Sequence, residues 1–359
     1  MNCSSAVLAL AAFLVTSSAS AAVIKFATLA PEGTDAMKAM GDIDKEVQAR
    51  TGGTLKFKMY AGGKQGEDKD IVRKIRAGQL QAGGFTGVGL GEIAPLVRVL
   101  DAPWLFRDHA EVDHVYERFA PDFEKALGDA GYVLLGWTEV GFVHIFSKAP
   151  VYGPEDIRKL KIWLWEGDAI AEAAYLALGV SPKPLSVTDV MTSLQTGLID
   201  SVYSAPLYAI ALQWHEKTKY IHSSAVANAS GAVLVSKKAF DALPEAERKV
   251  LLEVSRKRLK ELNEQIRKSN ASALEQLKKQ GLTVTAATPA ALKAYEEAGR
   301  KARRSLAGRL YPAELLDRVE KSLEAFRAQK SSEKATALPP AGQAAHVRAA
   351  CPAGEKCSK

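Results

Sequence analysis

The sequence contains little cysteine and, beyond its N-terminus, no long hydrophobic run. Cysteine occurs three times in 359 residues, at Cys3, Cys351 and Cys357. No C-x-x-C pair is present, so the chain lacks the usual dithiol redox motif. After the N-terminal segment no stretch reaches about 18 uninterrupted apolar residues, the length typical of a transmembrane helix. The mature chain is therefore expected to be soluble.

Motifs for enzymatic chemistry are also absent. There is no G-x-S-x-G, no Walker A and no G-x-G-x-x-G, and Gly87 to Gly91 misses the dinucleotide spacing. His109 and His114 lie five residues apart, on different faces of a helix, so a solvated surface is favoured over a zinc site. No nucleophile is paired with a base. We expect no catalytic residue, no metal and no cofactor, hence not an enzyme.

Concentrated positive charge is missing as well. The net charge is +7, and Lys and Arg are spread along the chain, which gives no reason to expect nucleic-acid binding. Arg300, Arg303 and Arg304 are interpreted as an exposed basic helix face.

The N-terminus has the pattern of an export signal. Residues 6–15 are apolar and Ala19-Ser20-Ala21 is a small-x-small cleavage signal, although no Lys or Arg precedes the run. We predict that residues 1–21 form a signal peptide, cleaved after Ala21 or Ala22, and that the protein is periplasmic. Cys351 and Cys357 would then be the remaining cysteines, and one small disulfide is favoured over free thiols or a soft-metal site.

The mature chain alternates strands and helices. Strands are expected at 23–29, 55–60 and 80–86, separated by helices beginning at Thr34 and Asp68. This alternation indicates βαβ units and a mostly parallel sheet. Residues 131–147 are long for one strand and are interrupted by glycines, which suggests a crossover between lobes. Residues 244–281 carry a helical stripe and predict one helix of roughly 50 Å.

Six stretches together resemble the DctP-type solute-binding proteins of TRAP transporters over about residues 23–325. They are IKFATLAPEGT (24–34), KMYAGGKQGEDKDIVRKIRAGQLQAGGFTG (58–87), DAPWLFRD (101–108), GPEDIRKLKIW (153–163), GVSPKPLSVTDVMTSLQTGLIDSVYSAP (179–206) and SKKAFDALPEAER (236–248). The resemblance implies a two-lobed α/β periplasmic binding protein with crossover strands and a long helix spanning both lobes. Lobe I would comprise 22–139 plus 229–268, lobe II 140–228 plus 269–329, and 330–359 would be a flexible tail.

The sequence departs from the family pattern where the ligand's carboxylate is usually held. The family Arg of the K-I-R stretch is replaced by Trp163, and a second Arg after G-F is replaced by Val143. The family Asn appears as Tyr203-Ser204. An unpaired carboxylate is costly to bury, so a simple mono- or dicarboxylate is not the expected ligand.

We expect the ligand to be apolar, aromatic or amphiphilic, or a cation held over aromatic faces. Trp104 is weighed as a cleft or a core residue, and the helix after Thr34 is expected to direct its N–H groups at the cleft. The predicted ligand-binding residues are Trp163, Trp165, Tyr203, Ser204, Trp214, Phe142, Val143, Thr34, Thr86 and Tyr208.

Three other interpretations stay open. A displaced cation, Lys161, Lys183 or Arg98, would restore a conventional carboxylate receptor. The chain would otherwise be a periplasmic sensor or chaperone without a permease, or a secreted enzyme on the same fold. The resemblance implies TRAP membrane permease subunits as partners. Residues 213–220 resemble the branch associated with tetratricopeptide-repeat periplasmic proteins. A homodimer is also compatible with the sequence.

Overall fold

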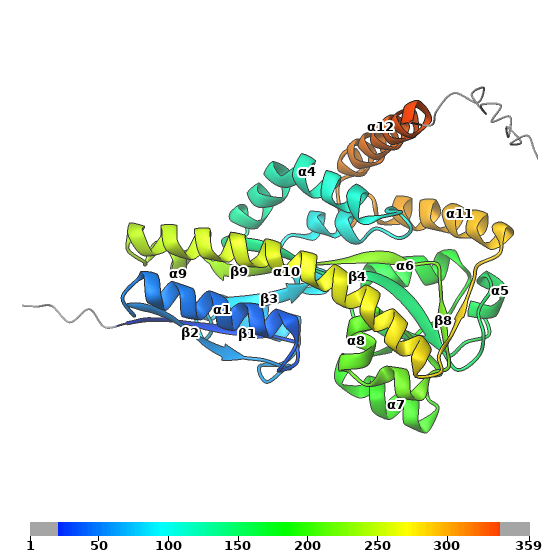
Figure 1. The fold of residues 1–359 in the computed structure, drawn as a ribbon, viewed down its shortest axis with the longest axis horizontal. Coiled ribbons are helices and arrows are strands. Elements are labelled where there is room, and N and C mark those ends of the chain that lie inside the picture. Colours follow the sequence, from blue (N-terminus) through cyan, green and yellow to red (C-terminus); the bar gives the residue numbers. More distant parts are fainter. Residues whose placement is uncertain (1–20, 338–359) are drawn as a thin grey trace, which may run out of the picture.

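The computed structural model describes residues 21–337 and contains two α/β lobes (Figure 1). Residues 1–20 of the predicted signal peptide and the three cysteines lie outside the described residues. Within the described part, no helix has the length and apolar character needed to cross a membrane.

The first lobe is built on the predicted βαβ units. Strands β1 (Ala22–Thr28), β2 (Leu55–Tyr60) and β3 (Ala82–Thr86) pair in parallel, with helices α1 (Asp35–Arg50) and α2 (Asp68–Arg76) between them. Met37, Met40, Ile43 and Val47 form the buried stripe of α1. The helix is capped as predicted, because the Thr34 hydroxyl accepts a hydrogen bond from Met37 N.

Two long strands pass from the first lobe into the second. They are β4 (Tyr132–Ser147) and β9 (Ala227–Ser236), which pair antiparallel. The pairing shifts register between Leu134 and Gly136 and again between Glu139 and Gly141, so β4 bends twice. β9 also pairs antiparallel with β3. The sheet is therefore mixed, and the prediction of a mostly parallel sheet is wrong because the crossover strands run against their neighbours.

The second lobe continues the same sheet. β4 pairs antiparallel with β7 (Ser201–Ser204) and β8 (Tyr220–His222), and β8 pairs in parallel with β10 (Thr283–Thr285). A separate two-stranded piece contains β5 (Trp163–Trp165) and β6 (Lys183–Leu185). The remaining elements of this region are α5 (Pro154–Ile157), α6 (Ala169–Ala177), η2 (Val187–Asp189), α7 (Val190–Thr196), α8 (Pro206–Ala211) and η3 (Trp214–Lys217).

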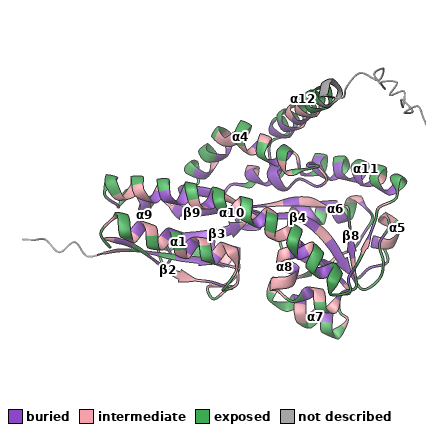
Figure 2. Ribbon diagram, viewed as in Figure 1, coloured by how far each residue is buried: buried purple, intermediate pink, exposed green. Residues whose placement is uncertain are grey.

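One helix of 35 residues, α10 (Glu245–Lys279), follows the short α9 (Lys237–Asp241). It packs on α1 in the first lobe, on β4, and on α8 in the second lobe. The predicted lobe-spanning helix is thus present, although Pro244 is its N-cap rather than its first residue. Figure 2 shows exposed residues along the outer faces of α1 and α10 and buried residues in the strands beneath them.

The remaining helices form a layer on the face of the crossover strands opposite to α1 and α10 (Figure 1). They are α3 (Gly87–Ile93), η1 (Pro95–Asp101), α4 (His109–Asp129), α11 (Pro289–Leu306) and α12 (Ala313–Ala337). α12 continues to Ala337, so the tail predicted from Lys330 begins too early. Arg303 is 8% exposed and donates to Glu320 and to the Pro103 carbonyl, so the interpretation of Arg300, Arg303 and Arg304 as an entirely exposed face is wrong.

Candidate functional site

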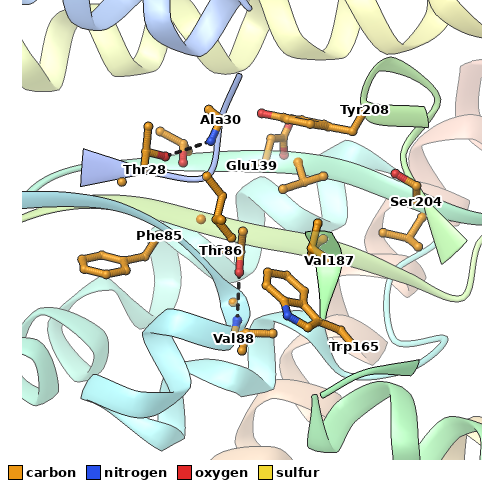
Figure 3. A pocket seen from close by; sticks show the side chains of 18 of the residues that line it. Thr28, Ala30, Phe85, Thr86, Val88, Glu139, Trp165, Val187, Ser204 and Tyr208 are labelled. Atoms are coloured by element: carbon orange, nitrogen blue, oxygen red, sulfur yellow. Dashed lines mark hydrogen bonds between the residues drawn. The ribbon is translucent and has the colours of Figure 1, made fainter. Parts of the chain in front are cut away.

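A cavity of about 470 Å³ lies between the two lobes. The first lobe contributes β1, β3 and the start of α3, and the second contributes β5, α6, β7, α8 and Trp214. The crossover strands β4 and β9, together with α10, complete its wall. Figure 3 shows Thr86 and Val88 of the first lobe and Trp165, Val187 and Ser204 of the second among the side chains that line it.

The second-lobe wall is an aromatic stack. The ring of Trp163 lies 4.8 Å from that of Tyr203 and 6.4 Å from that of Trp165, stacked on both, and meets Trp214 edge-on at 5.1 Å. Trp163 is 2% exposed, and its Nε1 donates to the Leu185 carbonyl across the β5–β6 pair at 3.0 Å. Trp165 is half-buried, so more of its surface remains accessible from the cleft.

Eight of the ten predicted ligand-binding residues line the cavity. They are Trp163, Trp165, Tyr203, Ser204, Trp214, Val143, Thr86 and Tyr208. Val143 is buried on β4, at the position where the family resemblance placed an Arg. Burial raises the pKa of Tyr208 to about 12, so its hydroxyl stays protonated at neutral pH and can donate a hydrogen bond.

Thr34 and Phe142 are not on the cavity wall. Thr34 is occupied by capping α1, and its hydroxyl donates to the Pro31 carbonyl at 2.8 Å. Phe142 points to the other side of β4, as the alternation of a strand requires, and packs on His109. Trp104 stacks on Tyr295 with ring centres 5.5 Å apart, which makes it a core residue.

A buried carboxylate, that of Asp68, positions the cavity-lining residue Thr86 in the first lobe. Asp68 is fully buried at the start of α2, and its Oδ2 accepts hydrogen bonds from Thr86 N, Thr86 Oγ1 and Gly89 N. Burial raises the pKa of Asp68 to about 6 despite these donors. Asp68 thereby fixes Thr86 at the cavity without lining the cavity itself.

The charged residues of the wall were not predicted as site residues, apart from Arg98 as an alternative. Arg98 is the single Lys or Arg on the lining of this cavity, whose described walls also carry Asp101, Glu139 and Asp168. All four are buried. Their positions on η1, β4 and the start of α6 give no sequence signal, because the four meet only through tertiary structure.

Arg98 is bound by two of these acids. Its Nη2 donates to Asp168 Oδ1 at 2.7 Å, and its Nε lies 3.0 Å from Asp101 Oδ2. Burial opposes the charge on Arg98, but the two carboxylates outweigh it and raise its pKa. The third acid, Glu139, is paired with Arg267 of α10 at 2.6 Å, and Arg267 also binds Asp113 of α4.

A second connection crosses the cleft at Glu67. This residue caps α2 in the first lobe, and its carboxylate accepts hydrogen bonds from Trp165 Nε1 at 3.2 Å and from Val187 N at 2.9 Å in the second lobe. Glu67 does not line the cavity, but both of its partners do. It therefore ties the two lobes together beside the site.

The described residues contain no group of three or more His, Cys, Asp and Glu side chains arranged to hold a metal ion. His114 bonds Ser322 at 2.8 Å and stacks on Phe326, while His109 packs on Phe142. The two histidines thus have packing partners of their own. They are partly buried rather than on the solvated surface expected from the sequence.

Residues 26–308 match the family model described as bacterial extracellular solute-binding protein, family 7, or DctP. The chain belongs to this family. A relative, a solute-binding protein of Verminephrobacter eiseniae, is 26% identical over 242 residues, 67% of this chain and 72% of its own length. The C4-dicarboxylate-binding periplasmic protein DctP of Rhodobacter capsulatus is 24% identical over 266 residues, 73% of this chain and 79% of its own.

Solved structures of similar proteins share the fold. A TRAP periplasmic solute-binding protein of Ochrobactrum anthropi superposes with a TM-score of 0.78 at 26% identity, covering 88% of this chain and 98% of that one. The Bordetella pertussis receptor DctP7, which binds pyroglutamic acid, has the same fold with a TM-score of 0.78 at 20% identity, covering 84% and 100%. The chain is thus a solute-binding protein of the TRAP type with the predicted two-lobed architecture.

Proposed function

We propose that this protein is the extracytoplasmic receptor of a TRAP-type transporter whose ligand is an apolar, aromatic or amphiphilic small molecule rather than a simple carboxylate. The signal peptide would export it to the periplasm, where the two lobes close over the ligand and present it to membrane permease subunits. Lobe closure around a ligand is the usual motion of such proteins.

The observation that carries the proposal is the chemistry at two wall positions. Trp163 and Val143 stand where the family resemblance places carboxylate-binding arginines, and both lie on the cavity wall. A carboxylate entering there would lose its hydration without gaining a cation, which is costly. An aromatic or aliphatic group would instead bury apolar surface against Trp165, Tyr203 and their neighbours.

The conventional carboxylate receptor remains the second candidate because Arg98 lines the cavity. Lys161 and Lys183 do not support it: both are exposed, and Lys161 Nζ bonds the Gly197 carbonyl. Arg98 is already bound by two aspartates, which favours the apolar ligand. The R. capsulatus and B. pertussis relatives bind acids, so this chain would differ from them in ligand class.

Delivery to a permease and an association with a tetratricopeptide-repeat protein are further parts of the proposal. Permease genes beside the gene for this chain would support the transport role over a stand-alone sensor or chaperone. A tetratricopeptide-repeat protein that co-purifies with it from periplasm would support the second association, and a concentration-dependent mass in solution would reveal a homodimer.

The deciding experiment is native mass spectrometry of the protein purified from periplasm, followed by identification of the released small molecule. We expect an apolar, aromatic or amphiphilic molecule, and we expect Trp165→Ala to lose it while Leu176→Ala, a change at an exposed position on α6, retains it. A simple mono- or dicarboxylate released from the wild-type protein would contradict the proposed ligand class and favour the Arg98 alternative.

A further inference from the structure

Arg98 and Asp168 come from opposite sides of the cleft. Arg98 lies on η1, which packs with α3 and β9 beside the first lobe, and Asp168 caps α6 in the second. The two are 70 residues apart in sequence, yet their ion pair is 2.7 Å long and about 5% and 10% exposed. The pair therefore bridges the two sides of the cleft without a ligand.

The carboxylate of Asp168 has a full set of partners. Oδ1 accepts from Arg98 and from the backbone N–H groups of Ile170 and Ala171, at 3.2 Å and 3.4 Å for the latter two. Oδ2 accepts from the Tyr203 hydroxyl at 2.9 Å. Such a satisfied carboxylate is strongly held, because removing it would leave a buried guanidinium without its partner.

The remaining charges near the cavity do not offer a cation to a ligand. Asp101 forms an ion pair with the Nε atom of Arg98. Arg267 forms ion pairs with Glu139 and Asp113 and does not line the cavity. A ligand carboxylate would have to displace Asp168, share the Arg98 guanidinium with Asp101 and Asp168, or lie unpaired near three acids. All three are unfavourable because of like-charge repulsion, and the last also because the carboxylate loses its hydration.

We propose that Asp168 is the specificity-determining residue of this receptor: it supplies, from within the chain, the carboxylate that Arg98 would otherwise take from a ligand. The inference rests on the proposed function, since it explains why a cavity that contains an arginine selects ligands without an acid group. Replacing Asp168 by a neutral residue should therefore make the receptor accept carboxylates.

The test compares wild type with Asp168→Asn. Asparagine keeps the size of the side chain and caps helices well, so α6 should still form. Asp168→Ser is a second variant that also caps helices, should the first not fold. Glu139→Gln is the matched control, because it removes one buried negative charge from the same wall without touching Arg98.

The probes are 3-phenylpropionate and 3-phenylpropan-1-ol, which have similar size and differ in charge, with benzoate as a second acid. Dissociation constants are measured by isothermal titration calorimetry at pH 7. We expect the wild type to bind the alcohol at least as tightly as the acid. In Asp168→Asn we expect binding of the acids to tighten by about 10-fold or more, the value of a hydrogen bond to a charged group. Glu139→Gln should tighten acid binding clearly less than Asp168→Asn does, because Arg267 already pairs with Glu139 and no bond to Arg98 is changed.

A folded Asp168→Asn protein that binds neither acid more tightly than the wild type would overturn the inference. An equal gain in Glu139→Gln would also overturn it, because the effect would then be one of overall charge. The proposed function fails separately, if the wild-type protein itself prefers the acid to the alcohol.

Discussion

At the scale of single residues, the aromatic wall contains one ring that mainly supports its neighbours and two rings that remain accessible to a ligand. Trp163 is 2% exposed and lies between Tyr203 and Trp214, so it mainly fixes the wall. Trp165 and Tyr203 are only half-buried. The Tyr203 hydroxyl accepts from Trp165 N at 3.2 Å and donates to Asp168, which joins the aromatic stack to the charged pair.

Truncating Trp163 should therefore destabilise the folded protein. We expect Trp163→Ala to lower the free energy of unfolding by about 3–5 kcal/mol, because it leaves a large cavity under the wall. Trp163→Phe should cost clearly less, since it keeps the ring contact with Tyr203. Urea denaturation followed by circular dichroism measures both, and equal stabilities of wild type and Trp163→Ala would show that the ring is not packed as described.

Removing one oxygen atom from Tyr203 tests the link to Asp168. Tyr203→Phe leaves a carboxylate oxygen of Asp168 and the Trp165 N–H without this partner, so we expect a loss of about 1–3 kcal/mol in the free energy of unfolding. Tyr152→Phe is the matched control, because Tyr152 is 49% exposed and its change should stay within about 0.5 kcal/mol. Similar values for the two variants would contradict the network.

At the scale of elements, the β-bulge in β4 is where the chain passes from one lobe to the other. Register shifts between Glu139 and Gly141, and Gly141 has φ +105°, a backbone conformation that side chains rarely adopt. Asn270 of α10 holds this point through its Nδ2, which donates to the Val140 carbonyl at 3.0 Å. We propose this bulge as the hinge, at the boundary predicted between 139 and 140.

A side chain at Gly141 should disturb that hinge. A Cβ there would lie 2.6 Å from Asn270 Nδ2, and the backbone would be strained, so we expect Gly141→Ala to cost about 1–3 kcal/mol of stability. Gly128→Ala in α4 meets no atom within 4 Å and should stabilise by about 0.5–1 kcal/mol. Thermal denaturation of the two variants should move in opposite directions, and a Gly141→Ala protein as stable as wild type would refute the strain.

At the scale of the whole molecule, direct contacts between the lobes cross the cleft beside the cavity. Glu67 reaches from α2 to Trp165 and Val187, and Arg98 reaches Asp168 deeper in the cleft. We therefore expect each of these contacts to stabilise a closed state relative to an open one, in addition to the contribution of a ligand.

Glu67→Ala should shift the ligand-free protein towards the open state. It removes the two hydrogen bonds that Glu67 makes across the cleft, so we expect a larger radius of gyration by small-angle X-ray scattering. Glu166→Ala is the control, because it removes the same charge at an exposed position next to Trp165. Identical scattering from Glu67→Ala and wild type, both freed of ligand, would show that Glu67 does not hold the lobes together.

Stability should also depend on pH through two histidines of the second lobe, His144 and His222. Burial lowers the pKa of His144 and of His222. His144 Nδ1 donates to the His222 carbonyl, and His222 Nδ1 donates to the Val151 carbonyl. The folded protein then binds fewer protons than the unfolded chain below about pH 6.5, so stability falls as the pH drops through that value.

His222→Gln should weaken this dependence. Asp68 acts in the opposite direction, since its pKa of about 6 lies above that of the unfolded chain and its contribution is lost as the pH rises through 6. Wild type and His222→Gln both carry Asp68. Urea denaturation at pH 7 and pH 5.5 gives the loss in the free energy of unfolding for each protein, and the difference between the two losses is the contribution of His222. Equal losses of stability in both proteins would contradict the role of His222.

The sequence by itself determined the elements and the family. The helical stripes of α1 and α10 and the glycines of β4 are local signals, because backbone preference and burial periodicity act over a few residues. Trp163 and Val143 could be placed on the wall because the family resemblance supplied their positions. The parallel pairing of β1, β2 and β3 likewise followed from strand–helix alternation.

Only the tertiary structure decided the electrostatics of the cavity. Arg98, Asp101, Glu139 and Asp168 lie on three different elements and look like ordinary surface charges in the sequence. Their burial and pairing depend on how the two lobes meet, and a buried ion pair is defined by geometry rather than by residue type. The same holds for Phe142 and Val143, which strand alternation places on opposite faces of β4. Only the packing of the lobes decided that Val143 faces the cavity and that Phe142 packs on His109.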